Sequence, residues 1–196
     1  MKVIEKKQSL KQQYTYADYL TWNDDKRWEI IDGEVYDMSP APRRKHQFIS
    51  SELVKQIGVF IDKSGSPCQV YHAPFDVRFP EGINDNNKII DVVQPDIVVI
   101  CNPSMLDDAG CQGSPDFIIE ILSPYTAYKD FTIKMSLYEK NGVREYWIID
   151  PSNQMITVYL LENNNKFCSP IVYPGKGKLK VKSIEDIEIN LDPLFS

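Results

Sequence analysis

A chain of 196 residues with 42% hydrophobic side chains has enough apolar surface for the core of one domain, which we place over residues 1–196 with its core at about 44–161. Its net charge of −6 argues against a protein that coats nucleic acid nonspecifically, since such binding depends on neutralising phosphates. Residues 1–13 are charged and have no apolar segment, and no apolar run reaches membrane length. We therefore expect a cytoplasmic protein that does not contact a membrane.

The cysteines and histidines argue against several common kinds of site. The four cysteines stand far apart without a Cys-x-x-Cys pair, which disfavours a zinc knuckle or a disulfide scaffold; they are Cys68, Cys101, Cys111 and Cys168. We expect them to be reduced packing residues. A Ser-His-Asp site would need His46 or His72, and Ser123 lacks the Gly-x-Ser-x-Gly turn of such nucleophiles.

A short helix is predicted near the N-terminus. Thr15 and Asp18 form a variant of the capping box that opens a helix. The side of this helix that carries Tyr16, Tyr19 and Leu20 is expected to be buried.

The segment over residues 27–38 is predicted to form a β-hairpin with Asp32-Gly33 as its two-residue turn. This register pairs Ile31 with Glu34 and Glu29 with Tyr36, so both glutamates project from one face of the ribbon. Two like charges on one face are either solvated or gathered around a cation. We favour the solvated interpretation for the pair.

Residues 46–61 are predicted to form an amphipathic helix whose apolar stripe consists of Ile49, Leu53, Ile57 and Phe60. Glu52 lies beside this stripe. His46 stands at the start of the helix, where it can face a cleft, although a lone histidine is more often a hydrogen-bonded structural residue.

Two strands are predicted over residues 69–79 and 89–101, followed by a loop over residues 105–114 that is rich in Asp and Gly. Pro95 cannot donate to a strand ladder, so it marks a strand start or a bulge, and Asp96 follows at this irregularity. Taken alone, Asp96 is most simply a turn residue. Asp76, on the first of the two strands, is a second-tier candidate carboxylate.

The stretch from residue 115 to 151 reads as strand, helix, strand, and Glu120 is the residue in it that is hardest to explain. It stands inside an apolar run without alternation, Phe117 to Leu122, which is typical of a strand covered on both faces. Burying an ionised carboxylate costs several kcal/mol even after relaxation. Glu120 is therefore expected to be protonated, paired with a cation or bound to a metal.

The helix predicted from Thr126 to about residue 140 places a lysine beside this strand. On a wheel drawn at about 100° per residue, Lys134 falls at the centre of the apolar arc, with Asp130 on the same side and Lys129 on the polar side. Lys134 either extends to solvent past the sheet or reaches a site beside Glu120, and we favour the site. Further strands and a closing segment that ends at residues 194–195 follow.

These segments resemble a known family. PDFIIEILSP, KDFTIKMSLYEKNGVREYWIIDP and the preceding VVQPDIVVI look like the Uma-type restriction endonucleases, a branch of the PD-(D/E)XK nuclease superfamily. The resemblance covers residues from about 14 to the C-terminus. It implies an α+β or α/β fold with a restriction-endonuclease-like core, in which a mixed central sheet is flanked by helices and preceded by the N-terminal helix and hairpin.

The resemblance also implies a metal-dependent nuclease that cleaves DNA. It makes Asp96 and Glu120 the metal ligands, and the main-chain carbonyl of Ile121 completes a set of hard oxygen ligands for Mg²⁺ or Mn²⁺. Leu122 stands where the superfamily's Glu-x-Lys pattern has its lysine. The resemblance implies that Lys134, on the following helix, takes the role of that lysine. The secondary candidates are Glu29, Glu34, His46, Glu52, Asp76 and Asp130. By analogy, a homodimer would bring two sites to two strands.

Two other functions remain open at this point. The chain can be an inactive nuclease fold that binds nucleic acid or a protein partner, with Glu120 and Lys134 kept as a buried ion pair. It can also be a metal-dependent hydrolase that acts on some other phosphate or acyl substrate with the same ligands.

Overall fold

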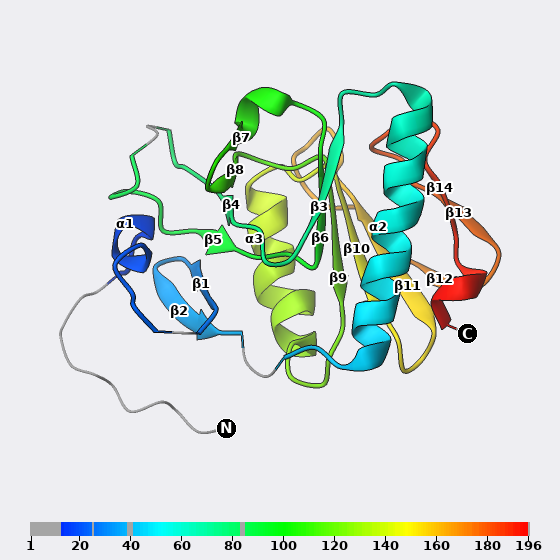
Figure 1. Ribbon diagram of the computed structural model, residues 1–196, viewed down its shortest axis with the longest axis horizontal. Coiled ribbons are helices and arrows are strands. Elements are labelled where there is room, and N and C mark those ends of the chain that lie inside the picture. The colour runs from blue at the N-terminus through cyan, green and yellow to red at the C-terminus, as the bar shows by residue number, and fades with distance from the viewer. Residues whose placement is uncertain (1–12, 25, 39–40, 83–84, 196) are drawn as a thin grey trace.

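The computed structural model describes residues 13–24, 26–38, 41–82 and 85–195, and it has a mixed α/β architecture with two six-stranded mixed sheets and few helices (Figure 1). The larger of the two sheets is the one with the longer strands. The long helix α2 (Arg44–Ser64) covers one face of this sheet, and α3 (Met135–Lys140) lies on the other side. The single central sheet that we predicted is thus only part of the fold. Among the described helices, none combines the length and the apolar character needed to cross a membrane.

The larger sheet contains the predicted strand, helix, strand unit. In sheet order its strands are β12 (Ile171–Pro174), β11 (Met155–Leu160), β10 (Glu145–Asp150), β9 (Phe117–Ile121), β6 (Ile97–Ile100) and β3 (Gln69–His72). Strands β9 and β10 are parallel and are joined by the helical segment that contains α3, whereas the other neighbouring strands are antiparallel. Ile97 pairs with Ile119, so the residue before β6, Asp96, lies opposite Glu120.

Alternate side chains of the central strands enter two different apolar cores. Ile97 and Ile119 face α2, whose stripe is buried as predicted, at Ile49, Leu53 and Ile57, with Phe60 partly buried. Val98 and Ile118 face the opposite core, which α3 and the smaller sheet share. All five residues of β9 are buried, as expected for a strand covered on both faces. By this alternation Glu120 points to the α3 side.

The smaller sheet brings together pieces of chain that the sequence analysis assigned elsewhere. In sheet order its strands are β2 (Glu34–Asp37), β1 (Trp28–Ile31), β5 (Val92–Val93), β4 (Val77–Arg78), β8 (Gly110–Gln112) and β7 (Leu106–Asp107). Strands β1 and β2 form the predicted hairpin in the predicted register, with the turn at Asp32-Gly33. The predicted loop over residues 105–114 is wrong, because these residues form strands β7 and β8 after a 3₁₀ turn, η1 (Pro103–Met105).

The two long strands predicted over residues 69–79 and 89–101 are each divided between the two sheets. The chain leaves β3 near Pro74 before it enters β4, and it leaves β5 at Gln94-Pro95-Asp96 before it enters β6. Both interruptions contain a proline, which cannot donate to a ladder. The irregularity predicted at Pro95 is therefore a change of sheet.

The two ends of the described chain close over the cores. Helix α1 (Tyr16–Tyr19) has the predicted capping box, but Leu20 is 58% exposed rather than buried because the helix ends at the preceding residue. At the other end, β13 (Lys178–Lys180) and β14 (Glu188–Asn190) form a two-stranded sheet, and the 3₁₀ helix η3 (Asp192–Phe195) packs against α2.

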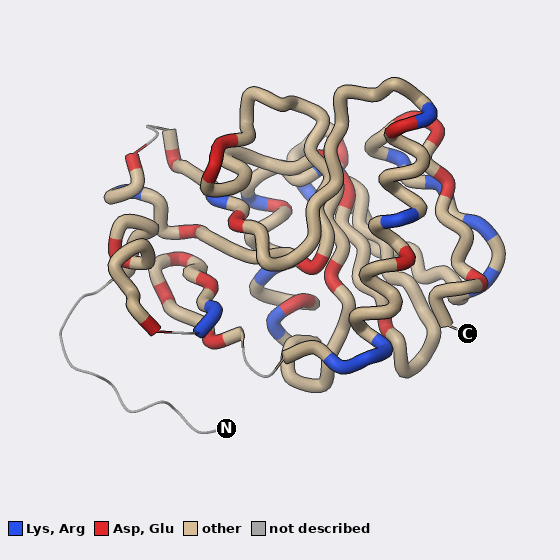
Figure 2. Tube along the Cα trace, in the orientation of Figure 1, with Lys and Arg blue, Asp and Glu red and all other residues tan. Residues whose placement is uncertain are grey.

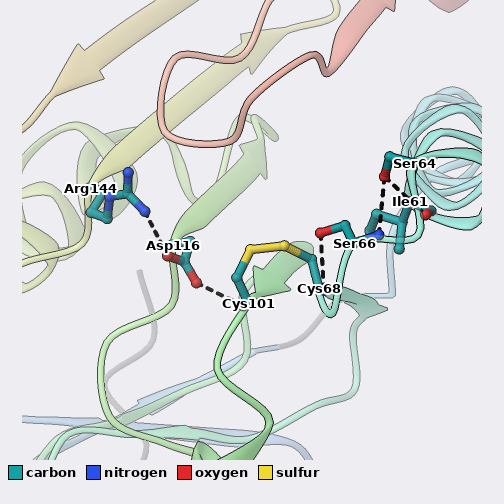
Figure 3. Close-up of a disulfide and its surroundings, with 7 residues drawn as sticks. All are labelled: Ile61, Ser64, Ser66, Cys68, Cys101, Asp116 and Arg144. Carbon is teal, nitrogen blue, oxygen red and sulfur yellow. Dashed lines mark hydrogen bonds and ion pairs between the residues drawn. A yellow bond between two sulfur atoms is a disulfide. The ribbon is translucent and has the colours of Figure 1, made fainter.

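Cys68 and Cys101 form a disulfide, which corrects the expectation that all four cysteines are reduced (Figure 3). The two residues lie 33 positions apart, but they flank the paired ends of β3 and β6 and so become cross-strand neighbours. Asp116 accepts a hydrogen bond from the Cys101 N–H at 2.7 Å. Cys111 and Cys168 are free, as predicted.

Candidate active site

Glu120 is buried on the α3 side of the larger sheet, with 3% of its surface exposed. Its Oε1 accepts hydrogen bonds from Lys134 Nζ at 2.7 Å and from the Tyr138 hydroxyl at 2.8 Å. Both partners come from the helical segment that follows β9, which turns back to pack against the strand it has just left. The carboxylate is thus paired with a cation, one of the three states expected from the sequence.

Asp96 lies beside Glu120 because β6 and β9 are neighbours. The Asp96 N–H donates to Glu120 Oε2 at 3.3 Å, and the Ile121 N–H donates to Asp96 Oδ2 at 2.7 Å. His46, in the first turn of α2, places its Nε2 3.0 Å from the same Oδ2. The structure therefore brings His46 to the candidate site, whereas the sequence left its position open.

Glu29 reaches the same place from the hairpin. Its side chain is fully buried, so the solvated interpretation of the hairpin glutamates is wrong for Glu29. Lys134 Nζ lies 2.7 Å from Glu29 Oε1, and the Gln94 N–H donates to that oxygen at 3.0 Å. One lysine thus binds a glutamate from each sheet, and this arrangement links the two sheets at the site.

A π-helical segment, η2 (Lys129–Lys134), explains why a second lysine, Lys129, reaches the candidate site. Its hydrogen bonds join residues five apart, which puts Lys129 and Lys134 on the same side of the helix. Lys129 Nζ lies 2.5 Å from Glu29 Oε2, and its side chain is only 13% exposed. The wheel drawn with α-helical periodicity placed Lys129 on the polar side. This assignment is wrong, since the Lys129 side chain is turned toward Glu29.

Carboxylates outnumber lysines in this buried ionic cluster, which consists of Glu29, Asp96, Glu120, Asp130, Lys129 and Lys134. Burial and the neighbouring carboxylates raise the pKa of Glu120 to about 8, against the opposing effect of Lys134. Burial also disfavours ionisation of Glu29, but Lys134 and Lys129 more than offset it and lower the pKa of Glu29 to about 2. The surplus negative charge therefore rests near Glu120, where a proton or a further cation can compensate it.

The other carboxylates suggested by the sequence differ in where they lie. Asp130 is buried, and burial raises its pKa while Lys134 opposes that rise. Glu34 is exposed and accepts a hydrogen bond from Tyr36, as the solvated interpretation predicted. Glu52 bonds to neighbours on its own helix. Asp76 lines a separate cavity of about 440 Å³ on the smaller sheet. Glu34, Glu52 and Asp76 therefore make none of the hydrogen bonds described for Asp96, Glu120 and Lys134.

Two members of the site were not singled out from the sequence. Tyr138 stands four residues after Lys134, a spacing that puts side chains on one face of a helix, and this spacing is the signal that could have identified it. Lys129 gave no such signal, because only the π-helix turns it inward.

The chain is similar to known proteins in sequence and in fold. The model of the Uma2 family, described as "Putative restriction endonuclease", matches residues 16–192. The chain belongs to the Uma2 family. A protein of Synechocystis sp. (strain ATCC 27184 / PCC 6803 / Kazusa), described as uncharacterized protein slr1290, is 25% identical over 170 residues, which are 85% of this chain and 84% of that protein.

A solved structure shares the fold of this Uma2 family chain. It is a crystal structure from Anabaena variabilis ATCC 29413, described as a putative nuclease belonging to DUF820. The match has a TM-score of 0.71 and covers 92% of this chain and 97% of that chain, at 23% sequence identity. The arrangement of two mixed sheets and few helices is therefore shared across a wide divergence in sequence.

Asp96, Glu120 and the carbonyl of Ile121 are the oxygen donors with which this Uma2 family chain could hold a metal ion. The hydrogen bonds described for Asp96 use Oδ2, and Lys134 and Tyr138 both bind Oε1 of Glu120. Within the described ranges, no three His, Cys, Asp or Glu side chains form a ready metal cage. Two carboxylates still suit Mg²⁺, which keeps several waters and binds through one or two carboxylates.

Acid should destabilise the protein partly through Glu29. Because its pKa is lowered from 4.5 to about 2, ionised Glu29 stabilises the fold above about pH 4.5, and this contribution is lost as the pH falls toward 2. The shift corresponds to about 3 kcal/mol. We expect urea unfolding between pH 6 and pH 3 to show a shallower acid dependence in Glu29→Gln than in wild type. Glu34→Gln, in the same hairpin but exposed, should keep the wild-type slope; equal slopes in all three proteins would contradict the assignment.

Proposed function

We propose that this chain is a Mg²⁺- or Mn²⁺-dependent endonuclease of the PD-(D/E)XK type that hydrolyses phosphodiester bonds in DNA. The observation that carries the proposal is the convergence of Asp96, Glu120 and Lys134 in one buried cluster of a Uma2 family chain. Two carboxylates at neighbouring strands can hold a metal ion, which would assist phosphodiester hydrolysis, and the lysine places a cation beside them.

In this proposal Asp96, Glu120 and the Ile121 carbonyl hold the ion. When bound, the ion supplies a water of lowered pKa and offsets negative charge on the scissile phosphate. Lys134, held between Glu29 and Glu120, orients the attacking water or stabilises the charge that develops on the phosphate. Tyr138 fixes the orientation of the Glu120 carboxylate through its hydroxyl.

In this proposal Lys134 takes the role of the lysine that is missing from the Glu-x-Lys pattern. Leu122, which occupies the place of that lysine, packs against the core on the α3 side. Lys134 instead approaches Glu120 from the following helix, with its ammonium 2.7 Å from Oε1. A cation is therefore present beside the carboxylate even though the strand does not supply it.

A second candidate function is that of an inactive nuclease fold that binds nucleic acid or a protein. The closed contact of Glu120 with Lys134 and Tyr138 favours it, because this pairing already satisfies one carboxylate oxygen without any metal. This alternative predicts no affinity for divalent cations. A hydrolase of other phosphoesters would instead bind the metal and cleave small phosphoesters while leaving DNA intact.

The test is cleavage of supercoiled plasmid with Mg²⁺ and then Mn²⁺, together with a calorimetric titration of each metal. We expect wild type to bind metal and nick the plasmid, and Asp96→Asn to lose both properties, since it removes a charged oxygen ligand.

The matched control is Asp76→Asn, a carboxylate of the neighbouring cavity that is not part of the cluster. It should retain metal binding and cleavage. A purified wild type that binds neither metal and leaves DNA intact would favour the inactive fold, and metal binding with cleavage of small phosphoesters alone would favour the other hydrolase.

A further inference from the structure

Two exposed tyrosines lie on the segment that joins the two halves of the candidate site. Tyr125 is 71% exposed and Tyr128 is 74% exposed, the two highest values among the exposed large hydrophobic side chains of the described residues. They stand between β9, which carries Glu120, and η2, which ends at Lys134. Rings so exposed contribute little to the core, so packing does not account for them.

The backbone below these rings is held in place. Ser123 Oγ accepts hydrogen bonds from the Tyr125 N–H at 3.3 Å and from the Thr126 N–H at 3.2 Å. The Thr126 hydroxyl in turn accepts one from the Ser123 N–H at 3.2 Å. The turn therefore presents Tyr125 from a fixed backbone, and Tyr128 follows in the first turn of the helix.

Basic residues also gather near the candidate site, where α2 begins. Arg43 occupies the N-cap position of α2 without a capping side-chain hydrogen bond, Arg44 is the first residue of the helix, and both side chains are exposed. Figure 2 shows this run of basic residues at the start of α2. In the same turn of α2, His46 contacts Asp96, which is bonded to the Ile121 N–H just before the tyrosine segment. Exposed arginines and exposed aromatic rings thus lie within a few residues of His46 and Glu120, respectively. An acidic chain with this local arrangement has the elements of a nucleic-acid contact surface.

We propose that Tyr125 and Tyr128 form a stacking surface for unpaired nucleobases, so that the substrate is DNA with unpaired nucleotides beside the scissile bond. This inference rests on the proposed nuclease function and specifies its substrate class. In an intact duplex the faces of the bases are stacked on one another, and only their edges are accessible in the grooves. A tyrosine ring can stack on a base only where the base has left the duplex stack, as in a single strand, a flap or a gap.

The experiment measures binding of labelled DNA by fluorescence anisotropy without added metal, so that it does not depend on cleavage. The probes are a single strand, a blunt duplex of the same sequence and a duplex with a single-stranded flap. We expect tighter binding of the single strand and the flap than of the duplex. Tyr125→Ala and Tyr128→Ala should each weaken binding of the single strand about tenfold.

Phenylalanine variants provide the matched control, because Tyr125→Phe and Tyr128→Phe keep the stacking ring and should bind as wild type does. Leu20→Ala, which changes an exposed apolar residue just after α1, should also leave binding unchanged. A 2-aminopurine base in the single strand should lose fluorescence on binding wild type and regain it with the alanine variants, which reports stacking directly.

The outcomes separate this inference from the nuclease proposal. Loss of single-strand binding in the alanine variants supports the stacking surface even if wild type cleaves nothing, in which case the nuclease proposal fails. Equal affinity of wild type for duplex and single strand, or wild-type binding by the alanine variants, overturns the stacking surface. If none of the three probes binds, the tyrosines serve another kind of partner and the inference is also overturned.

Discussion

Replacing Glu120 with glutamine is expected to reduce Mg²⁺-dependent DNA cleavage by at least about 100-fold, comparable to the loss of one preorganised transition-state contact. Glutamine keeps the shape of the side chain and a carbonyl oxygen for the hydrogen bonds from Lys134 and Tyr138, but it removes the charge that would bind the ion. The measurement is the initial rate of plasmid nicking at saturating metal. Metal affinity should fall with the rate, since both depend on the same carboxylate.

Glu145→Gln is the matched control for this experiment. Glu145 is also fully buried, but it lies on β10 and binds Trp147 and the Lys182 and Ser183 N–H groups, away from the cluster. Its variant should cleave DNA at the wild-type rate per folded molecule. If Glu120→Gln were as active as Glu145→Gln, Glu120 would not be a metal ligand.

The second large effect concerns stability. Lys134→Met should lower the free energy of unfolding by about 3–5 kcal/mol, the range for removing one partner of a buried ion pair. Lys134 is the cation shared by Glu29 and Glu120, so its loss leaves two buried carboxylates with less compensation. Urea denaturation at pH 7 measures the change. Under the proposed nuclease function the same variant should also be inactive, because it removes the ammonium group beside Glu120.

Two further variants determine whether charge or packing causes that loss. Lys140→Met, on the same helical segment, removes a lysine that is 53% exposed, pairs with Glu81 at the surface and lies 3.7 Å from the buried Asp91, so it should cost clearly less than Lys134→Met. The triple variant Lys134→Met, Glu29→Gln, Glu120→Gln should recover much of the stability, because neutral side chains replace the unpaired charges. A triple variant no more stable than Lys134→Met would show that packing is the cause.

Local patterns predicted the elements that depend on near neighbours. The capping box at Thr15, the turn at Asp32-Gly33 and the apolar stripe of α2 all form as expected, since each is stabilised by contacts within a few residues. The buried strand β9 also follows from the sequence, because a continuous apolar run requires cover on both faces, and so do the helix and strand that come after it.

Contacts between distant segments could not be predicted in the same way. The disulfide of Cys68 with Cys101 depends on the pairing of β3 with β6, and the burial of Glu29 depends on a hairpin packing over the helix that carries Lys134. The inward position of Lys129 depends on a π-helical turn that α-helical periodicity does not reveal.

The sequence by itself determined that Glu120 is buried and that Lys134 lies on the inner side of the following helix, because a charge inside an apolar run or arc has few places to go. Only the tertiary structure decided which groups meet there. It set Asp96 opposite Glu120 by the register of β6 on β9, and it brought His46 and Glu29 from two other elements. The physical reason is that burial is encoded locally by hydrophobicity, whereas the partner of a buried charge is chosen by how strands and helices far apart in the chain pack together.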